Sequence, residues 1–180
     1  MRSTSVLASA IAVLSMLPTG ILPGPARGHL GPAVLAAARQ GSLSITAPAT
    51  ASLGATGVGG SLSAQMGTVT VTGPVISIAW TATVAASAFV TGAGTLAETI
   101  PNGGIAYWSG PVTSSSGIGL IATPGQPTAA DAQPLDTART AFQLLAGANS
   151  VIQWNPTLVV TVPAAAVAGT YTGTIVHSVA

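Results

Sequence analysis

The chain has no cysteine and very little charge. Only 4% of its 180 residues are Asp, Glu, Lys or Arg, against about 25% in ordinary soluble domains. The absence of cysteine excludes disulfides, thiolate catalysis and cysteine-ligated zinc. The cations are scattered arginines, and they provide none of the basic clusters that neutralise nucleic-acid phosphates. Polarity comes instead from serine, threonine and glycine, as suits a secreted β protein, and stability must come from packing.

The N-terminal stretch is typical of a secretory leader. One early arginine precedes an apolar run over 6–17, which is shorter than the ~20 residues of a membrane span. Small residues suitable for cleavage occur at 24–26 and at 36–38, and the second site is preferred because the strand pattern starts just after it. A buried N-terminal helix is the alternative, but no amphipathic stripe is visible. We predict a leader over 1–38 and one domain over 39–180, secreted or associated with the cell wall.

Beyond this leader, apolar and polar residues alternate with a period of two in segment after segment. The strongest example is ISIAWTATV, whose apolar face consists of Ile76, Ile78, Trp80, Ala82 and Val84. The C-terminal run AGTYTGTIVHSVA alternates in the same way and predicts a last strand, with one side formed by Tyr171, Gly173, Ile175, His177 and Val179. Valine and threonine dominate, as β-branched residues do in strands. Turn signals separate the segments, and Pro101–Gly104 predicts a hairpin-type connection with positive φ at Asn102 and Gly103. We predict an all-β fold, an immunoglobulin-like antiparallel β-sandwich of roughly eight to ten short strands.

Side chains that could carry catalysis are scarce. The predicted domain holds one histidine, His177, and three acids. A lone histidine without a neighbouring acid is a poor base or ligand, so we expect His177 to be partly buried and hydrogen-bonded across its strand. Serines are plentiful, but no Gly-x-Ser-x-Gly elbow is present. Asp131 and Asp136 share a proline-rich loop over 122–138, and two carboxylates are few for calcium. We predict no enzyme, no metal and no cofactor.

Two adjacent aromatic residues are candidates for ligand contact. Tyr107 and Trp108 point to opposite faces if they lie on a strand, so one of them meets water. An exposed aromatic ring can stack on a sugar, which makes both residues possible glycan contacts. The alternative is that Trp108 covers the edge of the sandwich, since single exposed apolar residues are normal. Trp80, with aliphatic residues at two-residue spacing, is expected in the core.

The stretch ISIAWTATVAASAFVTGAGTLAETIPNGGIAYW resembles the first half of WxL domains, the wall-binding module of surface proteins in Gram-positive bacteria. The family's Trp-x-Leu tripeptide corresponds to Trp80-Thr81-Ala82, with alanine in place of leucine. Its second signature lies near the C-terminus, where tyrosine, an aliphatic residue, tryptophan and leucine correspond to Tyr171, Ile175, His177 and Val179. The C-terminal stretch looks most like a variant found in secreted actinobacterial proteins.

The resemblance implies a non-catalytic surface protein that binds peptidoglycan, or another cell-wall polymer, non-covalently. One alternative is an adhesive module that pairs with other surface proteins by strand addition. Another is a carbohydrate-binding module that uses Tyr107 and Trp108. We expect neither a nucleic-acid partner nor a membrane span in the mature form. The resemblance also places His177 in a slot where relatives hold tryptophan, so His177→Trp is expected to be tolerated or stabilising.

Overall fold

The computed structural model describes residues 6–7, 42–76 and 78–180, and the regular secondary structure of this part of the chain consists of antiparallel strands and three short helices. The strands are β1 Val6–Leu7, β2 Ser44–Thr46, β3 Ser61–Gln65, β4 Val69–Thr72, β5 Trp80–Ala86, β6 Phe89–Val90, β7 Thr99–Ile100, β8 Ile105–Trp108, β9 Val112–Pro124, β10 Gln133–Pro134, β11 Arg139–Trp154, β12 Thr157–Thr161 and β13 Ile175–Val179. Three short 3-10 helices are η1 Leu96–Glu98, η2 Asn102–Gly104 and η3 Ala129–Asp131. Apart from β1, the predicted leader lies outside the described residues.

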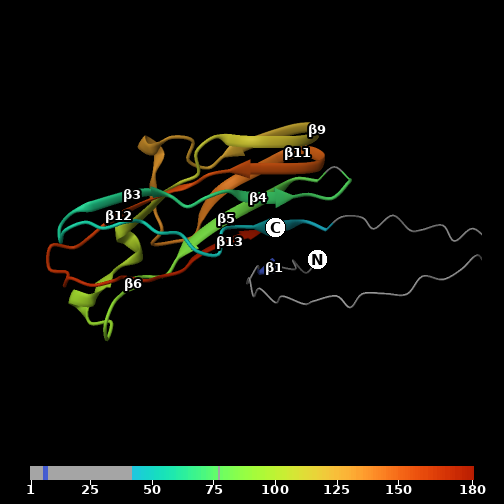
Figure 1. Cartoon of the computed structure of the whole chain (residues 1–180). Coiled ribbons are helices and arrows are strands. Elements are labelled where there is room, and N and C mark those ends of the chain that lie inside the picture. The colour runs from blue at the N-terminus through green and yellow to red at the C-terminus, as the bar shows by residue number, and fades with distance from the viewer. Residues whose placement is uncertain (1–5, 8–41, 77) are drawn as a thin grey trace, which may run out of the picture. The chain divides into compact units, whose positions relative to one another are not determined.

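The strands form two main sheets and a small ribbon (Figure 1). The larger sheet has the order β1-β13-β5-β11-β4-β2, with β9 also paired to β11, and the smaller has the order β10-β8-β12-β3. Strands β6 and β7 pair with each other. The apolar faces meet in one core, which confirms the predicted all-β sandwich. None of the helices in the described ranges is long and apolar enough to cross a membrane.

Strand β11 bends sharply, so that its two ends face the same core. Phe142 and Trp154 are 154 − 142 = 12 residues apart, a separation that would span about 40 Å in a straight strand. Their rings nevertheless stack with centroids 5.0 Å apart. The pairing with β9 shifts register several times between Leu144 and Val151. The first part of β11 pairs with β5 and the last part with β4.

Glycine makes this bend possible. Gly117 on β9 and Gly147 on β11 have φ angles of 140° and 149°, a region that side chains rarely tolerate. A Cβ atom on Gly117 would lie 2.8 Å from the Ala148 carbonyl oxygen, and one on Gly147 would lie 2.7 Å from the Leu120 side chain. Strands β9 and β11 therefore approach each other too closely at the bend for any residue larger than glycine at these two positions.

The predicted core face of β5 is confirmed for Trp80, Ala82 and Val84, which are at most 3% exposed. Ile76 was assigned to the same face, but it is 50% exposed, because the strand begins only at Trp80. The hairpin predicted at Pro101–Gly104 is also wrong. That segment forms η2, and neither Asn102 nor Gly103 has a positive φ, because the chain crosses there from β7 to β8 of a different sheet.

Candidate functional site

A chain of hydrogen bonds joins three buried side chains from three strands. The indole Nε1 of Trp154 on β11 donates to the Tyr107 hydroxyl on β8 at 3.1 Å. That hydroxyl lies 3.3 Å from Nε2 of His177 on β13. A hydroxyl that accepts from the indole can still donate to Nε2, which requires a neutral imidazole with its proton on Nδ1. This chain crosses from the smaller sheet to the larger one.

The surroundings of these groups keep them neutral. Burial lowers the pKa of His177 to about 4, and it raises the pKa of Tyr107 well above its usual range. No carboxylate contacts His177, and the described residues contain no cluster of three His, Cys, Asp or Glu side chains. The prediction that His177 hydrogen-bonds across its strand is wrong, because its partner Tyr107 lies on the other sheet of the sandwich. The geometry makes His177 a neutral link between the two layers.

The structure brings most of the WxL-like motif residues together on two neighbouring strands. The first tripeptide lies on β5 and the end of the second motif lies on β13, which pairs with β5. Ala82 is opposite Val179, and His177 is opposite Val84. Val179 and His177 are 3% and 6% exposed, while Ile175 at the start of β13 is half-buried. Both positions at which the family has leucine therefore meet in the core.

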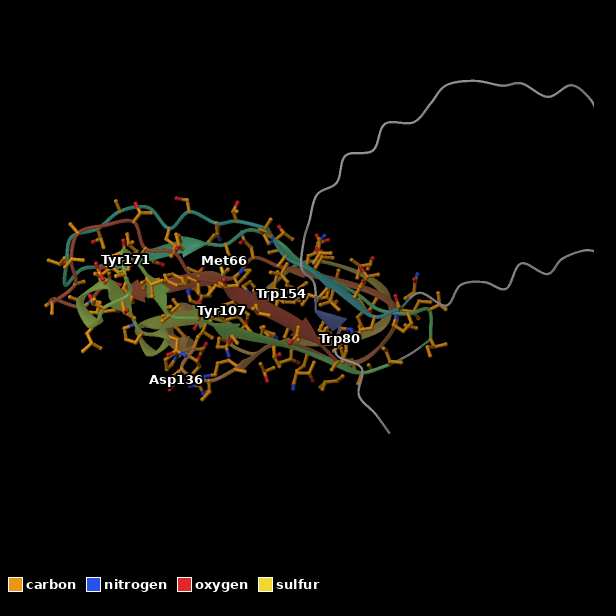
Figure 2. The ribbon with its side chains drawn as sticks, turned by 90° about the horizontal axis from the view of Figure 1, so that it is seen from below. Met66, Trp80, Tyr107, Asp136, Trp154 and Tyr171 are labelled. Atoms are coloured by element: carbon orange, nitrogen blue, oxygen red, sulfur yellow. The ribbon has the colours of Figure 1, made fainter. Side chains whose placement is uncertain are left out.

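Trp80 and Tyr171 lie toward opposite ends of the sandwich, with Tyr107 and Trp154 between them (Figure 2). The Trp80 indole Nε1 lies 3.5 Å from Ser150 Oγ at the bend of β11. The sequence pattern placed Tyr171 on the last strand, but β13 begins only at Ile175. The segment before β13 makes one isolated bridge instead, between Thr172 and Val90 of β6.

The half-buried Tyr171 fixes its own segment through its hydroxyl group. That hydroxyl donates to the Val167 carbonyl oxygen at 2.8 Å and also lies 3.2 Å from the Ala97 carbonyl oxygen. This bond to backbone four residues upstream resembles the tyrosine corner of immunoglobulin-like sandwiches, but Tyr171 precedes the last strand and not the one before it. Tyr171 thus ties the segment before β13 to the turn η1.

Trp108 lies on the outer face of the smaller sheet. Its neighbour Tyr107 is 0% exposed, so the prediction that Tyr107 contacts a glycan is wrong. Trp108 points the other way and is half-buried. Strand pairing places Thr157 of β12 opposite Trp108, and Gln65 of β3 opposite Thr157. We call this line of three residues across β8, β12 and β3 the Trp108 row.

Neither the Trp108 row nor the row beside it contains a charged residue. The next row toward the other end of these strands contains Ala106, Val159 and Ser63. Asp136 on the connection after β10 forms an ion pair with Arg139 at 2.7 Å. The Asp131 carboxylate accepts hydrogen bonds from the backbone N–H and the hydroxyl of Thr128 at the start of η3. Both loop carboxylates are therefore engaged locally, and neither belongs to the row.

Sequence reasoning missed the central position of Trp154. Its ring stacks on Phe142, donates to Tyr107 and lies 6.5 Å from the His177 ring, centroid to centroid. The sequence did contain a pattern that indicates burial, because Ile152 and Trp154 are two residues apart in the run SVIQW and so share one face of a strand. Both are 0% exposed in the structure. The alternation predicts the inward direction but not the partners.

Comparison with known proteins gives no match: no family model fits the chain, and no curated protein or solved structure is similar to it. What the protein does must be inferred from its residues and their geometry.

Proposed function

We propose that the protein is a secreted, non-catalytic surface protein that binds the bacterial cell wall non-covalently, with the glycan of peptidoglycan as its ligand. The observation that carries this proposal is the Trp108 row. Trp80 and Trp154 are 3% and 0% exposed, so Trp108 is the one tryptophan of the three that presents part of its ring to solvent. The leader-like N-terminal sequence and the WxL-like motifs are consistent with a role at the cell surface.

The chemistry of the row suits a neutral saccharide. An indole offers a rigid apolar surface on which the C–H face of a sugar ring can lie. The exposed Gln65 amide offers both donors and an acceptor for sugar hydroxyls, while Thr157 between the two side chains is only 5% exposed and forms the floor of the row. An uncharged surface incurs little desolvation penalty when it is covered. Trp108 thus provides the stacking surface, and Gln65 provides orientation.

The test is a sedimentation assay with the full chain and purified Gram-positive walls. Trp108→Ala should move most of the protein from the wall pellet to the supernatant, while Trp108→Phe keeps an aromatic surface and should retain much of the binding. Leu96→Ala is the control, because Leu96 is 97% exposed and lies on η1, outside the row. Equal pelleting of Trp108→Ala and the parent would contradict the proposal.

Fluorescence gives an independent measurement of the same contact. Because the other two tryptophans are buried, iodide should quench mainly Trp108. Soluble wall glycan fragments should protect this emission in the parent and have no effect in Trp108→Phe. Emission that is unchanged by fragments at every concentration would count against stacking on the ring.

An adhesive module is the second candidate, and one observation favours it. The 13-residue strand β9 pairs only with β11 among the described residues, so its other edge offers free backbone groups to another strand. The exposed Ile118 and Ile121 lie on it, and β9 contains no charged residue that would oppose pairing. Light scattering should then show oligomers that Ser115→Pro or Ile121→Lys disperses. A strict monomer at high concentration would exclude this candidate.

A further inference from the structure

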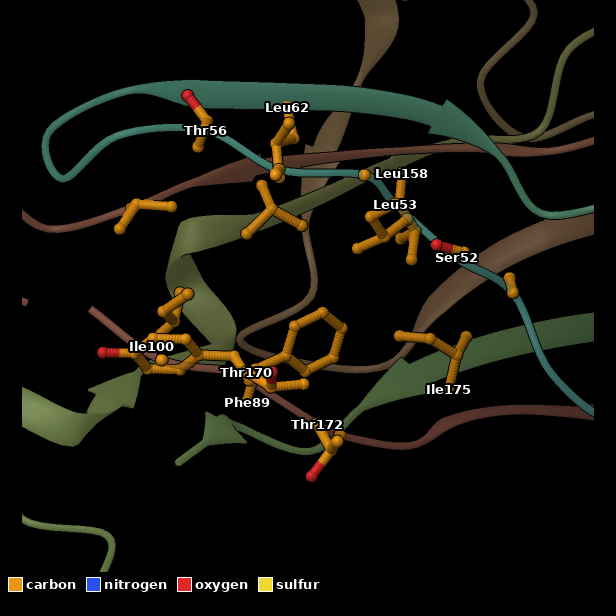
Figure 3. Close-up of a pocket in the computed structure, with 18 of the residues that line it drawn as sticks. Ser52, Leu53, Thr56, Leu62, Phe89, Ile100, Leu158, Thr170, Thr172 and Ile175 are labelled. Carbon is orange, nitrogen blue, oxygen red and sulfur yellow. The ribbon is translucent and has the colours of Figure 1, made fainter. Parts of the chain in front are cut away.

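An apolar groove lies between the two layers of the sandwich, away from the Trp108 row. Its volume is about 810 Å³, within the ~300–1,000 Å³ of small-molecule sites. One wall comes from β3 and β12 and the other from β6, β7 and the start of β13 (Figure 3). The aliphatic and aromatic side chains that face each other across it are Leu62, Leu158, Val160, Phe89, Ile100 and Ile175.

The groove is covered on one side by a segment that is weakly attached. Residues 49–55, which we call the strap, run along it without regular secondary structure. Within the part of the chain that the structure describes, no backbone–backbone hydrogen bond involves the strap. Leu53 is its one residue that is not fully exposed, and this side chain packs against the core. One leucine therefore holds the strap over the groove.

The walls contain nothing that would recognise a charged ligand. No Asp, Glu, Lys, Arg or His lines the groove, and its one titratable residue is Tyr171. The Tyr171 hydroxyl is already bonded to Val167. A carboxylate, phosphate or ammonium group would lose its hydration here without gaining an opposite charge. The polar atoms at the rim, among them Ser52 and Thr172, are neutral hydroxyls.

The dimensions favour an elongated occupant. The lining residues of β12 and its extension run from Leu158 to Val162, which is about 13 Å of strand. Protein interiors are normally close-packed, and an unfilled apolar gap of this size forfeits dispersion contacts along both walls. An apolar chain that enters along the strands restores those contacts without any polar partner.

We propose that the groove binds the single long acyl chain of a lipid with an uncharged head group, and that the chain enters when Leu53 withdraws and the strap moves aside. The head group remains at the rim, near the hydroxyls of Ser52 and Thr172. This site is separate from the Trp108 row, and its occupancy does not depend on wall binding.

The experiment uses the full chain and a neutral fluorescent probe, N-phenyl-1-naphthylamine, displaced by monoacylglycerols below their micelle concentrations. Burial of each additional methylene should tighten binding about fourfold. The series from octanoyl through decanoyl to dodecanoyl glycerol should therefore lower the Kd by roughly two hundredfold in total. Dodecanoate has the same chain with a charged head and should bind at least tenfold more weakly than dodecanoyl glycerol. Kd values that do not change with chain length would overturn the proposal.

Matched variants locate the site. Leu62→Asp places a carboxylate in the β3 wall of the groove and should weaken the binding of dodecanoyl glycerol at least tenfold, and Leu62→Asn repeats the test without charge. Leu96→Asp and Ile118→Asp change exposed aliphatic residues that do not line the groove, at 97% and 74% exposure, and should bind as the parent does. Melting without lipid verifies that each variant is folded. Parent-like binding by both folded Leu62 variants, or equal losses in the two controls, would show that the chain binds elsewhere.

Discussion

Acidification should destabilise the protein through the buried His177. The imidazole is 6% exposed and lies between Tyr107 and Trp154. Burial lowers its pKa from 6.5 to about 4 in the folded state. One pKa unit corresponds to about 1.4 kcal/mol, so a difference of this size makes protonation cost about 3 kcal/mol of folding free energy.

The direction follows from which state takes up the proton. Above pH 6.5 the imidazole is neutral in both states, and its contribution to stability is fully present. Between pH 6.5 and 4 His177 is protonated in the unfolded chain but stays mostly neutral in the folded protein. The free energy of unfolding therefore falls by up to about 1.4 kcal/mol per pH unit as the pH decreases. Below pH 4 both states are protonated, and the loss levels off. Glu98, whose pKa is lowered by its hydrogen bonds with Thr95, contributes only from its ordinary value of 4.5 downward.

The assay is urea denaturation followed by circular dichroism at pH 7, 6 and 5, with His177→Gln as the matched variant. A glutamine carbonyl can still accept from the Tyr107 hydroxyl but does not titrate. We expect the free energy of unfolding to fall by about 2 kcal/mol from pH 7 to 5 in the parent, and to stay nearly level in the variant. Parallel curves for the two proteins would refute the assignment of the slope to His177.

Further substitutions test the packing of the sandwich. Trp80→Ala should cost about 3–5 kcal/mol, because a ring that is 3% exposed leaves a cavity, and an unchanged urea midpoint would contradict its core position. Tyr171→Phe removes the bond to Val167 and should cost about 1 kcal/mol by the same assay, with no loss expected if the corner is unimportant. His177→Trp should destabilise the fold by about 1–3 kcal/mol through overpacking and so lower the melting temperature, because the centroids of two rings already lie 5.7 and 6.5 Å from the imidazole. An unchanged or raised melting temperature would restore the expectation drawn from the family resemblance.

The sequence could predict which side chains face inward, because a strand repeats every two residues. The alternation placed Trp80, Ala82 and Val84 on one face, and the same period placed His177 with Val179 on β13. These assignments need no knowledge of the neighbouring strand, since the pleat alone turns alternate side chains toward the core. The pattern failed where the strand itself stopped, at Ile76 before β5 and at Tyr171 before β13.

The partners across the core could not be predicted, because they are set by topology. Tyr107 and His177 are 70 residues apart in the sequence, and nothing local to either one indicates the other. The bend of β11 depends on Gly117 meeting the Ala148 backbone and Gly147 meeting Leu120, and these close approaches become visible only after the strands pair. Pro101–Gly104 has the residues of a tight turn, but whether such a turn joins neighbours in one sheet or crosses between sheets is a long-range property.

The scarcity of charge has the same consequence for both proposed sites. The Trp108 row and the acyl groove contain no ionised side chain, so neither can draw its ligand by long-range attraction or select it by ion pairing. Affinity at both must come from apolar surface removed from water, and selectivity from the penalty for burying a ligand's charge without a partner. A polyanionic wall polymer therefore gains nothing from its charge on either surface, whereas a neutral glycan and a neutral lipid lose nothing. Under both proposals, this difference favours uncharged glycans and lipids over charged polymers as ligands.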